Sequence, residues 1–179
     1  ILDRRFSDGV RVLTDEELDR LVDDYVAAAR LAHACGFRFV DAKACHGYLG
    51  HEMLGATTRP GRYGGSIENR MRFITRIVEG IRSVVPGLGV VVRASIFDVV
   101  PHRKGPEGVG VPEPVTGEEP GFGVLMNEDL DRALNDARAR LTHVSRIGVR
   151  WICTTAGSPY YNPHVQRPAF FPPLDGYDP

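Results

Sequence analysis

The sequence has few cysteines and no pattern that would tie them together. Cys35, Cys45 and Cys153 are three in 179 residues, an odd number, and they lack the close spacing of a metal site. A disulfide framework is therefore not expected, and the sequence favours the reducing cytoplasm. The side chains of Cys45 and Cys153 are interpreted as small buried groups rather than reactive thiols.

Long hydrophobic runs and an excess of charge of one sign are also missing. An apolar run such as residues 90–92 ends at Arg93, far short of the roughly 18 residues that a membrane span needs. The formal net charge is −1, with acidic and basic residues interleaved. These features argue against a membrane or a nucleic acid as partner and favour a small-molecule substrate, with a homo-oligomer left open.

What recurs along the chain is an amphipathic helix followed by a short strand. The first helix carries a capping-box pattern, Thr14 with Glu17, and a glycine stop at Gly36. The helices are expected to begin at Thr14, Ser66 and Asn127, and the strands to cover residues 37–43, 88–95 and 150–155. Residues 101–123, rich in proline and glycine, predict a long loop, and residues 157–179 show no helix signal.

Helices alternating with strands predict a parallel sheet covered by helices. A glycine-rich phosphate loop is missing at the start of every predicted helix, which weakens the interpretation as a dinucleotide-binding open sheet. We therefore expect an α/β fold, a partial (β/α)8 TIM barrel with about three consecutive αβ units and parallel strands. A whole barrel needs about 250 residues. Residues 1–179 are thus expected to form one incomplete barrel domain, a fragment with N- and C-terminal parts missing, and the initial Ile1 suggests a start further upstream.

In parallel α/β folds the reactive groups gather where the strands end. The end of the first strand is the richest such place, because it brings together an ammonium, an imidazole and a phenol in Lys43, His46 and Tyr48. The second strand ends near Arg93.

Residues 36–73 carry two uncommon motifs in a fixed order. His46-Gly47-Tyr48 follows the first strand, and Tyr-Gly-Gly-Ser-Ile-Glu-Asn-Arg occupies residues 63–70. In this order and spacing the stretch resembles the signature segment of the old yellow enzyme family. The similarity continues through Arg93 and, more weakly, to Thr155, so it extends over most of the chain.

The resemblance implies FMN as cofactor and NADH or NADPH as electron donor. It implies hydride transfer from reduced flavin to an electron-poor alkene or carbonyl-type acceptor. In the family two side chains at this strand end hydrogen-bond the acceptor oxygen, and a tyrosine protonates the neighbouring carbon. His46 matches the second oxygen-binding residue and Tyr48 the proton donor, while Arg93 matches the arginine beside the flavin. Such donors favour the transition state, because charge develops on the oxygen as the hydride arrives.

The first oxygen-binding position departs from the family pattern, since Lys43 stands where histidine is usual. Lysine still donates hydrogen bonds, but as a compact point charge without planar geometry. A fixed positive charge there favours anionic ligands or a more strongly polarised carbonyl.

Other interpretations of the same residues remain open. Lys43 is also a candidate Schiff-base lysine of a non-redox barrel enzyme, or a solvated residue at a strand end. A metal site from His46, His51 and Glu52 is disfavoured, because the spacing is not that of a helical histidine pair, and no metal is expected.

The remaining alternatives are structural. Tyr48 could serve packing alone, and Arg93 could be an internal ion-pair partner. Gly64, Gly65 and Arg70 are interpreted as structural. A truncated segment without activity of its own is the third functional alternative.

Overall fold

The first αβ unit forms where the capping signals predict it. The computed structural model describes residues 11–97, 102–104, 110–112, 131 and 134–157. Helix α1 spans Asp15–Ala34, and its capping box is present: the Glu17 amide donates to Thr14 Oγ1 at 3.2 Å, and the Thr14 amide donates to the Glu17 carboxylate at 2.8 Å. Gly36, with φ of +90°, ends the helix. Strand β1 follows at Phe39–Ala44.

The second unit is also confirmed, and a short helix not foreseen from the sequence precedes it. Helix α3 spans Ile67–Val84 with Ser66 as its N-cap, and strand β2 spans Gly89–Phe97. Helix α2, Leu49–Leu54, lies between β1 and α3. Its six residues are too few for a hydrophobic period to stand out, so no helix signal was recognised there.

Of the third unit, the structure describes residue 131 and residues 134–157. Helix α5 spans Asn135–Arg146 and strand β5 spans Trp151–Ala156. The predicted start at Asn127 lies outside the described residues, as do residues 158–179 of the tail. The predicted long loop at 101–123 needs a correction, because two short strands within it, β3 (His102–Lys104) and β4 (Gly110–Pro112), pair antiparallel.

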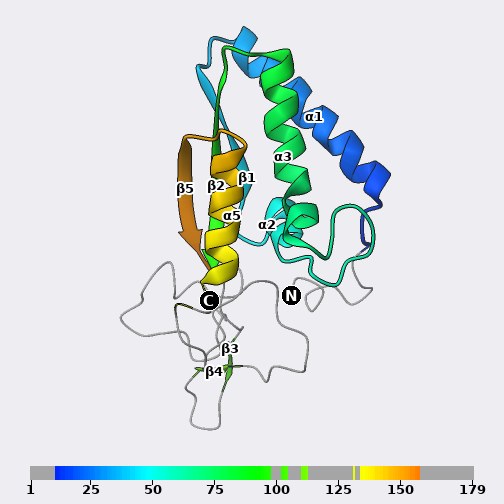
Figure 1. Ribbon diagram of the computed structural model, residues 1–179, viewed down its shortest axis with the longest axis vertical. Helices are drawn as coiled ribbons and strands as arrows, with labels where there is room; N and C mark the ends of the chain where they lie inside the picture. Colours follow the sequence, from blue (N-terminus) through cyan, green and yellow to red (C-terminus); the bar gives the residue numbers. More distant parts are fainter. Residues whose placement is uncertain (1–10, 98–101, 105–109, 113–130, 132–133, 158–179) are drawn as a thin grey trace.

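The three longer strands form one parallel sheet in the order β1-β2-β5 (Figure 1). The register places Lys43 beside Arg93, and Arg93 beside Cys153. Parallel strands joined through helices in chain order are the repeating pattern of a (β/α)8 barrel.

The helices cover one face of this sheet, and the core lies between them. Apolar side chains of β1 and β2 pack there against α3 and α5; they are Ala42, Ala44, Val90, Val92, Ile74, Ile77, Val78, Ile81 and Val144. On the other face, by strand alternation, lie Phe39 and Trp151, with 60% and 61% of their surface exposed. Cys153 is on this face too and is exposed, so the expectation that it is buried was wrong. In a closed barrel this face lines the interior.

The outer edge of β1 is open in the described part of the chain. A groove of about 450 Å³ lies between this strand and α1, with Tyr25, Phe37 and Phe39 among its lining residues. Within the described residues β1 pairs with β2 alone. In a closed barrel a further strand pairs at such an edge, and closure removes the exposed backbone groups.

Candidate active site

Two cations lie side by side near the C-terminal ends of β1 and β2. Lys43 and Arg93 are register partners on the face that the helices leave exposed. The Asp41 carboxylate lies 2.9 Å from Arg93 Nη2 and offsets part of this charge. Both side chains of the pair are partly exposed, so the pair contributes little stability and mainly orients the guanidinium. The alternative of Arg93 as an ion-pair partner is thus partly realised.

The Nε donor of Arg93 is not used by the ion pair. Its Nε atom is buried and has no hydrogen-bond partner among the described residues. A buried donor left in this state costs about 1–3 kcal/mol. An acceptor atom of a ligand on the exposed sheet face would remove that cost, so the atom marks a place for an oxygen or nitrogen of a bound group.

The turn after β1 has an unusual backbone. His46 has φ of +63° and is the one non-glycine residue in the described ranges with a positive φ; Gly47 follows with +72°. A left-handed conformation costs a residue with a side chain on the order of 1 kcal/mol and is often kept at functional sites. Tyr48 then caps helix α2 without a side-chain hydrogen bond to the helix.

Helix α2 packs closely on the end of β1, and this closeness depends on a glycine. A Cβ atom on Gly50 would lie 2.6 Å from the Lys43 carbonyl oxygen, so a larger residue would push the helix away. The helix therefore fixes where the turn at residues 45–48 leaves the strand.

The predicted site residues come together where β1 passes into this turn. Lys43 Nζ lies 3.7 Å from the centre of the Tyr48 ring, a cation–π contact. Burial lowers the pKa of His46 below its ordinary value, and the charges of Lys43 and Arg93 lower it further. His46 is therefore neutral at pH 7, with one ring nitrogen available as donor and the other as acceptor.

The Tyr-Gly-Gly-Ser motif has the structural role predicted for it. The fully buried Tyr63 donates from its hydroxyl to Asp19 at 2.5 Å, which ties the segment to α1. A Cβ atom on Gly64 would lie 2.0 Å from the Arg59 carbonyl oxygen, so only glycine fits there. The motif holds the loop before α3 and places no side chain at the strand ends.

A buried charge network behind the strand ends was missed by the sequence reasoning. Asp136 on α5 accepts from Arg70 Nη2 at 2.7 Å and from Arg140 Nε at 2.9 Å. Burial would raise the pKa of Asp136, but the hydrogen bonds and charges of the two arginines outweigh it and hold that pKa below its ordinary value. Arg70 was expected to have a structural role; its partner, 66 residues away, could not be read from spacing.

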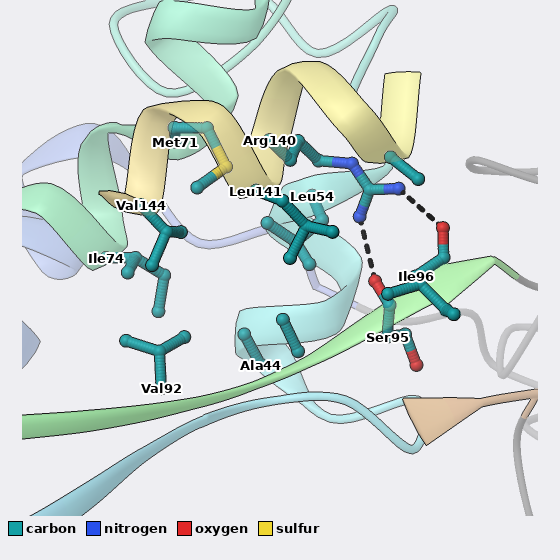
Figure 2. A pocket seen from close by; sticks show the side chains of 12 residues that line it. Ala44, Leu54, Met71, Ile74, Val92, Ser95, Ile96, Arg140, Leu141 and Val144 are labelled. Carbon is teal, nitrogen blue, oxygen red and sulfur yellow. Dashed lines mark hydrogen bonds between the residues drawn. The ribbon is translucent and has the colours of Figure 1, made fainter. Parts of the chain in front are cut away.

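Arg140 connects this network to the end of β2. Figure 2 shows its guanidinium donating to the carbonyl oxygens of Ser95 and Ile96, at 2.9 and 3.0 Å. The apolar cavity in the same view measures about 10 Å³, at most the space of one water, so it is a packing gap and not a ligand site.

Metal and thiol chemistry receive no support from this region. Within the described ranges there is no group of three His, Cys, Asp or Glu side chains placed to hold a metal ion. Nδ1 of His51 is used by the Gly47 amide, at 2.7 Å. Burial raises the pKa of the Cys45 thiol, which keeps it protonated at neutral pH.

No helix in the described part is long and apolar enough to cross a membrane.

Comparison with known proteins places these residues in a family. The family model described as NADH:flavin oxidoreductase / NADH oxidase matches residues 4–143, more than three quarters of the chain. The chain is similar to NADH:flavin oxidoreductase FG08077 of Gibberella zeae, with 37% identity over 91 residues, 49% of this chain and 22% of that protein. It is also similar to the putative 12-oxophytodienoate reductase 4 of Oryza sativa subsp. japonica, with 38% identity over 49% of this chain and 23% of the relative.

Solved structures agree with the fold. A 2-naphthoyl-CoA reductase complex covers 84% of this chain and 19% of its own length, with a TM-score of 0.60 and 23% identity. The match supports the fold alone, and the prediction of a partial (β/α)8 barrel is confirmed. The chain thus spans about a quarter or less of the length of these relatives. With the model match over residues 4–143, the chain belongs to the NADH:flavin oxidoreductase / NADH oxidase family, which confirms the resemblance to old yellow enzymes.

Proposed function

We propose that this protein is an FMN-dependent NAD(P)H oxidoreductase that reduces an electron-poor alkene or carbonyl-type acceptor. The observation that carries the proposal is the gathering of Lys43, His46 and Tyr48 at the end of β1, beside Arg93. They are three proton or hydrogen-bond donors with different chemistry, and Lys43 is on the sheet face that would line the interior of a closed barrel.

The residues present fit a flavin. The buried Arg93 Nε lacks a protein partner among the described residues, and a polar atom of a flavin ring would satisfy it. Its positive charge would also stabilise negative charge on the ring and so tune the reduction potential. FMN, when bound, would supply the hydride chemistry between the nicotinamide and the acceptor.

Lys43 and His46 would bind the acceptor oxygen. Both can donate a hydrogen bond, and the Lys43 charge opposes the negative charge that develops on that oxygen as the carbon accepts a hydride. Lys43 and Arg93 are neighbours with Asp41 as the counter-charge. This balance of charge favours acceptors that carry a carboxylate or another anionic group.

Tyr48 would complete the reduction as general acid. Hydride addition to one carbon leaves a carbanion-like neighbour, and the phenol gives it a proton, so the alkene gains one hydride and one proton. The Tyr48 oxygen is left with a negative charge until solvent reprotonates it. Lys43, whose ammonium lies against the ring, stabilises that charge.

The test is a visible spectrum of the full-length protein before and after anaerobic addition of NADPH or NADH. A yellow protein whose flavin band bleaches supports the proposal, and Arg93→Met should weaken FMN binding. A colourless protein that cannot be reconstituted with FMN would overturn it. Borohydride trapping of a carbonyl substrate on Lys43 would then favour the Schiff-base alternative.

A further inference from the structure

The turn that carries the proposed catalytic groups has one long hydrogen bond of its own, from the Tyr48 amide to the Cys45 carbonyl oxygen at 3.4 Å. His46 and Gly47 are both left-handed, with φ of +63° and +72°. A residue with a side chain adopts this conformation at a cost, so a contact from outside the turn would add to its own long bond in making it the preferred state. A hydrogen bond to the turn's own backbone is such a contact.

His51 provides that bond. Its side chain is on α2, it is only 4% exposed, and its Nδ1 atom accepts the Gly47 amide hydrogen at 2.7 Å. A backbone amide can only donate, so Nδ1 carries no proton and the ring, when neutral, carries its proton on Nε2. The contact ties the middle of the turn to a side chain four residues further on.

The surroundings keep His51 in this state. Burial, the charge of Arg140 and the ring of His46 together lower the pKa of His51 to about 4. Arg140 is fixed in turn by Asp136 and by the carbonyl groups at the end of β2. Arg140 thus binds the end of β2 directly. It also favours the neutral His51 ring, which holds the turn after β1.

We propose that His51, as a neutral hydrogen-bond acceptor, is a positioning residue that fixes the turn at residues 45–48 and so directs His46 and Tyr48 toward the acceptor. His51 does not touch the reacting atoms; it acts through the Gly47 amide. The proposal rests on the function assigned above to His46 and Tyr48. The competing explanation is that the His51 side chain only packs in the interior beside α2 and has no effect on the turn.

Two substitutions separate these explanations in the full-length protein. His51→Asn keeps an acceptor near the position of Nδ1, while His51→Leu keeps bulk and burial but removes the acceptor. Reoxidation of the reduced flavin by an α,β-unsaturated acceptor should be about ten- to a hundredfold slower in the Leu variant and within a few-fold of wild type in the Asn variant. KM should change less than kcat. Equal rates in the Leu variant and wild type would overturn the proposal.

A second measurement needs no activity. Nitrogen-15 NMR of histidine-labelled wild-type protein should show one histidine with unprotonated Nδ1 from pH 5 to 9, and its signal should vanish in His51→Leu. A protonated Nδ1 would contradict the proposal even if the Leu variant does not fold. If wild type shows no flavin turnover but the expected NMR signal, the proposed function fails while the geometry of the turn stands.

Discussion

Lys43 Nζ lies 3.7 Å from the centre of the Tyr48 ring, so the residue that departs from the family pattern contacts the expected proton donor. This contact links two features that the sequence shows only as neighbours five residues apart. In the proposed function the ammonium would act on two centres, the acceptor oxygen and the phenol that loses its proton.

Removing the phenolic hydroxyl should separate the two halves of the catalytic cycle. Tyr48→Phe keeps the ring under Lys43 but cannot donate a proton. We expect acceptor reduction to fall by about a hundredfold or more, within the range of general acid catalysis, while flavin reduction by NADPH changes little. Stopped-flow absorbance of each half-reaction checks this. An unchanged rate of acceptor reduction would exclude Tyr48 as the donor.

Exchanging Lys43 should change the preference among acceptors. Lys43→His restores the residue usual in the family and removes a fixed charge. The ratio of kcat/KM for a carboxylate-bearing alkene to that for its methyl ester should fall about tenfold, the effect of roughly 1.4 kcal/mol of lost interaction. Lys43→Met should lower this ratio too and slow both substrates. The same ratio in wild type and in both variants would show that Lys43 does not discriminate between charged and neutral acceptors.

Arg140, which is buried on α5, should contribute far more to the free energy of unfolding than the exposed Arg138 on the same helix. Arg140→Met leaves Asp136 with one arginine partner and removes the guanidinium donor from the carbonyl oxygens of Ser95 and Ile96. We expect a loss of about 3–5 kcal/mol in the free energy of unfolding. Arg138→Met, on the same helix but at an exposed ion pair with Asp131, should change it by no more than about 0.5 kcal/mol. Denaturant unfolding of both variants compares the two, and similar losses would contradict the account.

The free energy of unfolding should fall as the pH is lowered, because His51 resists protonation in the folded protein. Its pKa is about 4 in the folded protein and 6.5 as the ordinary value, so the unfolded chain binds a proton first as the pH drops. The contribution is fully present above about pH 6.5 and is lost progressively down to about pH 4, by about 3 kcal/mol in all. Arg140 and His46 are the charged or titratable groups that oppose protonation. His51→Asn should show a smaller decrease between these pH values in denaturant unfolding; equal slopes would contradict this assignment.

Local signals predicted most of the fold that the structure describes. The capping box at Thr14, the Ser66 cap and the Gly36 stop act within a few residues, so these patterns can be recognised in the sequence and predicted two helix starts and one helix end. Helix α2 and the pairing of β3 with β4 were missed. A helix of six residues is too short to show a hydrophobic period. Strands of three residues form because they pair with each other, and their own composition does not predict them.

The residues of the candidate site were named from the sequence, but the residues that support them were not. Lys43, His46 and Tyr48 lie at one strand end and were found by that rule together with the family resemblance. The roles of His51 and Arg140 depend on contacts across the fold, 45 residues apart in the case of Arg140 and Ser95. One signal was present, a histidine three residues after Tyr48 in an apolar context, but it was weighed only as a metal ligand.

The central claim is that the end of β1 reduces an acceptor with a hydride from FMN and a proton from Tyr48. The most direct measurement is anaerobic reoxidation of the NADPH-reduced, full-length protein by an α,β-unsaturated carboxylate, followed at the flavin band. We expect the band to return as the saturated product forms with one solvent hydrogen, and Tyr48→Phe to slow this return. A reduced flavin that only oxygen reoxidises, or a protein that binds no flavin, would contradict it.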